Sequence, residues 1–164
     1  VKSLLDRDVR ISLDATALVN YILPLLSGKN VVVTPHAGEF KRMFGDNPPE
    51  SKKARITMVE KTAKEYSITI LLKGPIDIIS NGTITYLNPT NTPGMTVGGT
   101  GDVLSGIIAG MLARNRNGLE SAVISAYFNG LAGKMTQKKL GSHMTATDLL
   151  DALPGVMKSF DKIK

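Results

Sequence analysis

Short apolar runs without polar alternation are the feature that most restricts how this chain can fold. Val31–Val33 is β-branched throughout, and residues 68–72 hold four large aliphatic side chains and one threonine. Strands that are apolar on both faces must be covered on both faces, as in parallel sheets flanked by helices. Segments with helical spacing lie between and after these runs. The sequence therefore predicts a layered α/β domain with a mostly parallel sheet.

The remaining elements are predicted from periodicity and turn residues. Asn81-Gly82 indicates a hairpin, and Thr145 or Thr147 would cap a last helix that stops near Pro154. The length of 164 residues suits one domain, so we predict a single domain over residues 1–164. The expected strands are residues 9–13, 31–33, 68–72, 76–80 and 83–87, and the expected helices are residues 15–26 (with Leu18, Ile22, Leu25 and Leu26 inward), 51–66 and the region from 102 onward.

Composition and charge exclude several functional classes. The chain has no cysteine, which rules out disulfide scaffolds and thiol nucleophiles and fits a cytoplasmic protein. No apolar run approaches the ~20 residues that span a bilayer, so we predict no membrane partner. The net charge is +6, but the basic residues are scattered and the few aromatic residues, 5% of the chain, are not interleaved with them. We therefore predict no nucleic-acid binding and an anionic small-molecule substrate instead.

A long glycine-rich segment precedes the first carboxyl-terminal helix. Residues 88–102 would form a loop of fifteen residues, and loops of that length in compact domains are usually functional. Gly98, Gly99 and Gly101 would let successive amide groups converge on an anion at the start of the helix. Asp102 follows in the first turn, either as an ordinary helix-start carboxylate or as a base that accepts a hydroxyl proton. This arrangement predicts nucleotide-dependent phosphoryl transfer.

Two other loops follow predicted strands, where ligands bind in open α/β sheets. His36 lies in the loop at 34–39, either as a structural histidine or as a site residue. Lys73 precedes Gly74 and is either a solvated turn lysine or a point charge that binds a phosphate. His143 receives no role. Two histidines this far apart do not indicate a metal site, so we predict no metal bound by protein side chains alone.

Residues 91–106 and 34–39 closely resemble the two signatures of ADP- or ATP-dependent NAD(P)H-hydrate dehydratases, and Lys73-Gly74 resembles the family's nucleotide-side turn. Residues 13–18 and 146–150 also fall in the expected order. The family belongs to the ribokinase-like superfamily, so the resemblance implies a three-layer α/β/α fold. The family's amino-terminal third has no counterpart here. The resemblance therefore implies that residues 1–164 are the carboxyl-terminal portion of such a domain, an incomplete copy of the fold.

The resemblance also implies an activity and a set of site residues. Members of the family are lyases that phosphorylate the ring hydroxyl of the 6-hydrate of NADH or NADPH with ADP or ATP, and then eliminate phosphate; Mg²⁺ is the expected companion of the nucleotide. The implied roles are Asp102 as base and substrate contact, His36 as substrate contact, Lys73, Gly74, Pro75, Ile76, Asp77, Thr100 and Gly101 as nucleotide contacts, and Gly98, Gly99, Thr100 and Gly101 as the anion hole.

Some positions depart from the family pattern, and other functions remain open. Asn91-Thr92 stands where the family usually has glycine and asparagine, and Thr16 stands where it usually has a second acid. One alternative is a kinase for a hydroxymethylpyrimidine or hydroxyethylthiazole vitamin precursor. Another is a nucleotide-binding fragment without catalysis. A homo-oligomer, a separate amino-terminal portion and an epimerase partner are all compatible with the sequence.

Overall fold

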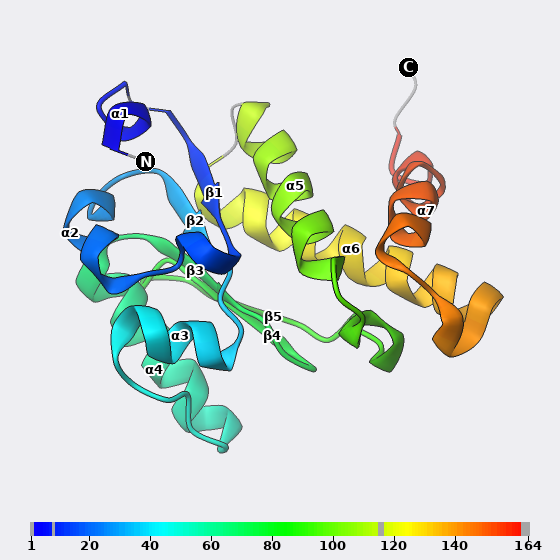
Figure 1. Ribbon diagram of the computed structural model, residues 1–164, viewed down its shortest axis with the longest axis horizontal. Coiled ribbons are helices and arrows are strands. Elements are labelled where there is room, and N and C mark those ends of the chain that lie inside the picture. Colours follow the sequence, from blue (N-terminus) through cyan, green and yellow to red (C-terminus); the bar gives the residue numbers. More distant parts are fainter. Residues whose placement is uncertain (1, 8, 115–116, 162–164) are drawn as a thin grey trace.

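The computed structural model describes residues 2–7, 9–114 and 117–161 and arranges them around one sheet (Figure 1). In the described residues the sheet has five strands in sequence order: β1 (Ile11–Leu13), β2 (Val31–Val33), β3 (Thr69–Leu72), β4 (Asp77–Ser80) and β5 (Thr85–Asn88). Neighbours β1, β2 and β3 pair in parallel, whereas β4 pairs antiparallel with both β3 and β5. All strands except β4 therefore run in one direction, which confirms the mostly parallel sheet.

Both faces of the sheet are apolar, because successive side chains of a strand point to opposite faces. Val31 and Val33 pack with Ile70 into one core cluster. Val32 and Leu71 belong to the cluster on the other face. The short runs that predicted a doubly covered sheet are thus buried on both faces, as expected from their lack of polar alternation.

Two layers of helices cover these faces, and the three-layer α/β/α arrangement is confirmed. The first layer comprises α1 (Lys2–Leu5), α2 (Leu23–Leu26), α3 (Ala37–Phe44) and α4 (Lys52–Tyr66). The second comprises α5 (Thr100–Ala113) and α6 (Gly118–Leu140), with α7 (Ala146–Lys158) packed against α6 on the outside (Figure 1). No helix in the described ranges is long and apolar enough to cross a membrane.

The helix predicted over residues 15–26 is wrong. The chain instead forms two short 3₁₀ turns, Ala15–Ala17 and Asn20–Ile22, before the single α-turn of α2. Pro24 accounts for the break, because it lacks an amide proton and its ring would clash with a carbonyl one turn earlier in a continuous helix. At the start of α2 the missing proton costs nothing. Leu25, which was predicted to face inward, is 39% exposed.

Two further boundaries differ from the prediction. Thr145, rather than Thr147, caps α7, and its amide donates to Asp148 Oδ2 at 2.7 Å. The helix runs through Pro154 to Lys158 instead of stopping there. The carbonyl that loses its partner belongs to Leu150, which is half exposed, so water can replace that bond. The hairpin is confirmed, with β5 beginning at Thr85 after a four-residue connection.

Candidate functional site

The carboxyl ends of β1, β2 and β3 meet at one edge of the sheet because the three strands are parallel. Asp14, Thr34 and Lys73 follow these strands directly, at the edge where open α/β sheets bind ligands. The backbone ties the three loops together: the amide of Thr34 donates to the carbonyl of Leu13 at 3.0 Å, and the amide of Lys73 donates to that of Pro35 at 2.8 Å. The side chains at this edge are therefore held by rigid elements.

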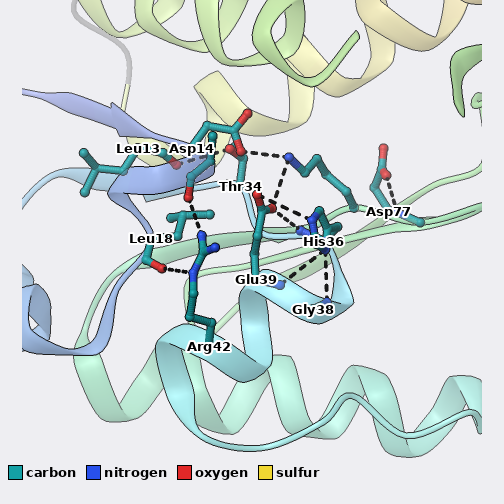
Figure 2. A network of polar contacts seen from close by, with 12 residues as sticks. Leu13, Asp14, Leu18, Thr34, His36, Gly38, Glu39, Arg42 and Asp77 are labelled. Carbon is teal, nitrogen blue, oxygen red and sulfur yellow. Dashed lines mark hydrogen bonds and ion pairs between the residues drawn. The ribbon is translucent and has the colours of Figure 1, made fainter. Parts of the chain in front are cut away.

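The ammonium group of Lys73 lies between two carboxylates. Its Nζ atom is 2.8 Å from Asp14 Oδ1 and 3.5 Å from Glu39 Oε2. All three side chains are largely buried, with 20% exposure for Lys73, 9% for Asp14 and 10% for Glu39. Figure 2 shows Asp14 and Glu39 converging from β1 and α3. Lys73 is therefore not a freely solvated turn lysine; its position is fixed by two partners.

His36 begins α3 and forms a capping box with Glu39. Its Nδ1 atom accepts hydrogen bonds from the amides of Gly38 and Glu39 at 3.0 and 3.3 Å, and its own amide donates to Glu39 Oε2 at 2.9 Å (Figure 2). Nδ1 is thus the acceptor nitrogen, which leaves the proton of a neutral imidazole on Nε2. The side chain is nevertheless 61% exposed. His36 is a structural cap whose Nε2 atom lies 3.5 Å from Glu39 Oε1, and its contact with the substrate stays a prediction.

The glycine-rich loop ends in a left-handed turn at the start of α5. Gly99 has φ +93° and precedes the first helical residue, Thr100. The hydroxyl of Thr100 is buried and donates to the carbonyls of Met95 and Val97 at 2.7 and 3.1 Å, so this side chain closes the loop. The first helical bond runs from the amide of Val103 to the carbonyl of Gly99. The amides of residues 100–102 precede it and are free of intrahelical acceptors.

Gly101 brings this loop against the lysine and aspartate of the sheet edge. A Cβ atom at this position would lie 3.2 Å from Lys73 Nζ and 3.4 Å from Asp14 Oδ2. The backbone of α5 therefore approaches Lys73 Nζ more closely than a side chain would comfortably permit and leaves only ordinary contact distance to Asp14. Gly98, by contrast, is exposed, faces open space and has no left-handed conformation, so its geometry does not require glycine.

Asp102 faces an open pocket of about 380 Å³ between β1 and the first turns of α5. Asp14 also lines it, together with two serines, Ser12 and Ser105, whose hydroxyl oxygens are 3.0 Å apart. Asp102 is exposed and, within the part of the chain that the structure describes, makes no side-chain hydrogen bond or ion pair. A simple capping role is thus not supported. Two carboxylates, Asp14 and Asp102, border one open pocket.

Asp77 lies at the end of the turn after Lys73 and is 3% exposed. It accepts hydrogen bonds from the amide of Gly74 at 3.1 Å and from the side-chain nitrogens of Asn91 and Asn88 at 2.8 and 3.0 Å. Its carboxylate is therefore occupied inside the protein, and a nucleotide contact by Asp77 would have to come from its backbone. Pro75 and Ile76 between them are exposed at the apex of the turn.

Burial raises the pKa of Asp77 above 3.8, although its hydrogen bonds oppose that shift. Because the pKa is higher in the folded state than in the unfolded state, the stability that this group contributes is present below pH 3.8 and is lost as pH rises through the folded-state value. We expect the unfolding free energy of the wild type to rise, relative to that of Asp77→Asn, as pH falls from 7 towards 3.8. Urea unfolding of both proteins across that range measures the difference, and a difference that stays constant with pH would contradict it.

The structure adds residues to which the sequence assigned no role. Asp14 and Glu39 hold Lys73, and Arg42 of α3 binds the loop that carries Asp14. Asp14 could have been found from its place directly after a strand, and Glu39 from its capping-box spacing, three residues after His36. His143 lies in a 3₁₀ turn, Gly141–His143, and remains without a role. Over the described ranges, no group of three or more histidine or acidic side chains could hold a metal ion.

Comparisons with known proteins agree on one family. A family model described as NAD(P)H-hydrate dehydratase matches residues 1–155. The chain is 66% identical over 99% of its length to an ADP-dependent (S)-NAD(P)H-hydrate dehydratase of Nitrosopumilus maritimus, and 62% identical over its whole length to that of Cenarchaeum symbiosum. It spans 57% of each of these relatives.

A solved structure gives the same result in three dimensions. The ADP/ATP-dependent NAD(P)H-hydrate dehydratase of Bacillus subtilis, co-crystallised with ATP and Mg²⁺, is 32% identical and superimposes with a TM-score of 0.85. The likeness covers 96% of this chain and 57% of that one.

Proposed function

The chain belongs to the NAD(P)H-hydrate dehydratase family, and on that premise we propose that it carries the phosphoryl-transfer site of an enzyme that repairs hydrated NADH and NADPH. In the proposed reaction, ADP or ATP phosphorylates the ring hydroxyl of the 6-hydrate. The C–O bond then breaks, phosphate leaves, a ring proton is lost and the dihydronicotinamide double bond is restored. Phosphate is the better leaving group, because hydroxide would have to depart as a strong base.

One observation carries this proposal: the start of α5, Lys73 and a carboxylate-lined pocket lie together. Gly101 lies close enough to Lys73 Nζ that the backbone amides at the start of α5 and the ammonium group could bind oxygens of the same phosphate. Such a cradle would stabilise the charge on the transferred phosphoryl group. Asp102, one residue further on, would accept the proton of the ring hydroxyl. His36 would contact the substrate through the exposed part of its ring.

The side chains present fit a magnesium ion next to the nucleotide. Mg²⁺ is usually held by one or two carboxylates together with substrate phosphates. Asp14 supplies one such carboxylate at the sheet edge, and it lines the pocket that Asp102 faces; Glu39 is occupied by Lys73 and by its capping box with His36. When bound, the ion would neutralise phosphate charge. Asp14 would be its protein ligand, and Lys73 would remain the fixed positive charge of the protein.

The proposed partners are two small anionic molecules, the hydrated dinucleotide and ADP or ATP. A chain without cysteine suits the reducing cytoplasm, where we place the protein. Because the chain spans about half the length of its relatives, we propose that the complete site also uses residues that correspond to their other portion. An epimerase partner and self-association remain part of this proposal.

The experiment offers the complete protein hydrated NADH, hydroxymethylpyrimidine and hydroxyethylthiazole in turn, each with ADP or ATP and Mg²⁺. We expect recovery of dihydronicotinamide absorbance with hydrated NADH, with release of phosphate in equal amount. We expect no phosphorylated product from either vitamin precursor. Phosphorylation of a precursor without recovery of NADH would replace the proposal with the kinase alternative, and nucleotide binding without any turnover would favour the non-catalytic fragment.

A further inference from the structure

The loop that carries Asp14 adopts a conformation that local preferences do not favour. Ala15 has φ +54°, in the left-handed region that residues with a Cβ atom rarely enter. The next residues form a single 3₁₀ turn, Ala15–Ala17, before Leu18 enters the core fully buried. Non-glycine residues persist in this region only where the surrounding structure imposes it. The direction of the Asp14 side chain therefore depends on whatever holds this turn.

Arg42 is the side chain that holds it. Its Nη2 atom donates to the carbonyl of Ala15 at 2.5 Å, and its Nε atom donates to the carbonyl of Leu18 at 3.0 Å. The two bonds span the 3₁₀ turn from one planar guanidinium group (Figure 2). A lysine could not reproduce them, because its ammonium group is a single point donor on a flexible chain.

The helix that supplies Arg42 is itself fixed against the site. Arg42 and Glu39 are three residues apart on α3, so they lie on the same side of that helix. Phe40 and Met43 of the same helix are fully buried and anchor it in the core, and the capping box of His36 fixes its first turn. One helix thus positions both carboxylates on Lys73: Glu39 directly, and Asp14 through the turn that Arg42 binds.

We propose that Arg42 is a positioning residue for the phosphoryl-transfer site, holding Asp14 in the orientation that fixes Lys73 and fits a magnesium nucleotide. The proposal deepens the proposed function and rests on it. Both hydrogen bonds of the Arg42 side chain go to backbone carbonyls of the Asp14 loop in the described residues, so it acts on the ligand through Asp14. The functional effect of removing Arg42 should therefore require that Asp14 is present.

The test compares Arg42→Ala, Arg42→Lys and Arg55→Ala in the complete protein. Arg55 is a matched control, because its Nε atom likewise donates to a backbone carbonyl, that of Pro49, at 2.9 Å, away from the site. We expect Arg42→Ala to weaken Mg·ADP and Mg·ATP binding about 10–100-fold, the range typical of partners that orient a metal ligand. Arg42→Lys should recover little of this loss, and Arg55→Ala should bind as the wild type does. Calorimetric titration measures the affinities, and melting curves show whether all variants are folded.

A double-mutant cycle separates positioning from a general structural effect. In the Asp14→Asn background, Arg42→Ala should change nucleotide affinity less than about twofold, because the group it positions is gone. Equal losses in both backgrounds would overturn the proposal. Full recovery by Arg42→Lys would also overturn it, because only the charge of the side chain would then matter. An equal loss of affinity in Arg55→Ala would overturn it as well.

A ligand-free measurement keeps this inference distinct from the proposed function. In the absence of nucleotide, the side-chain NMR signals of Lys73 should move in Arg42→Ala towards their positions in Asp14→Asn, and remain unchanged in Arg55→Ala. If the wild type binds no nucleotide, the proposed function fails while this shift still tests the role of Arg42. Unchanged Lys73 signals in Arg42→Ala would overturn the positioning role even if nucleotide binds.

Discussion

Replacing Asp102 by asparagine is expected to lower the turnover of hydrated NADH with ADP or ATP by about 10²–10⁴-fold, the usual contribution of a general base. Asparagine keeps the size of the side chain but cannot accept the hydroxyl proton. Asp102 makes no side-chain hydrogen bond or ion pair within the described residues, so the substitution should leave the fold intact. Binding of both ligands should change far less than turnover, because a base acts mainly in the transition state.

The assay follows dihydronicotinamide absorbance under saturating nucleotide, with melting curves for each variant. Asp151→Asn is the matched control: Asp151 is also an exposed carboxylate on a helix, but it lies on α7 away from the pocket. It should retain wild-type turnover. An Asp102→Asn protein that folds and turns over at the wild-type rate would show that Asp102 is only a helix-start carboxylate, and the proposed mechanism would be abandoned.

Gly101→Ala is expected to weaken ADP and ATP binding about 10–100-fold in a protein that still folds. The added Cβ atom would lie 3.2 Å from Lys73 Nζ. The ammonium group would have to move away from the helix start, where it is proposed to bind the phosphate. Loss of one charge-assisted hydrogen bond costs about 1.5–3 kcal/mol, which corresponds to that range of affinities. Alanine is also the better helix former, by up to ~1 kcal/mol.

Gly110→Ala provides the control within the same helix. A Cβ atom at Gly110 meets nothing within 4 Å, so it should bring the gain in helix propensity without a change in affinity. Calorimetric titration with AMP, ADP and ATP tests both variants. Gly99→Val is a poorer probe, because Gly99 has φ +93° and a Cβ atom there would lie 2.8 Å from that of Ala146. If Gly101→Ala and Gly110→Ala bind ADP equally well, the start of α5 is not the phosphate site.

The layers of the fold could be predicted from sequence because burial leaves a direct mark on composition. Val31–Val33 is apolar at every position, and the structure buries alternate residues on opposite faces. The region at residues 15–26 could not be predicted in the same way. Its leucines have helical spacing, but Pro24 and the left-handed Ala15 break the helix. Apolar spacing reports which residues are buried, and not which backbone conformation buries them.

The site shows a similar division. Gly101 and Lys73 could be proposed from the places of glycine and lysine at element ends, and the structure brings them together. The sequence could not show which carboxylates contact Lys73. Asp14 is 59 residues away from it, and only the order of the strands in the sheet makes the two neighbours. Burial of Asp77 was also hidden, since an aspartate after a turn is usually solvated.

The antiparallel strand β4 has a consequence for the order in which the site assembles during folding. It returns the chain so that the turn after β3 and the loop after β5 lie at one edge, joined by Asp77 with Asn88 and Asn91. These bonds span only 11 and 14 residues, and local hairpins form within ~1–10 μs. The bond from Lys73 to Asp14 spans 59 residues and needs the parallel pairing of three strands, which is slower to reach. We therefore expect the turn with Lys73 to take its shape from local contacts before its ion pair with Asp14 forms.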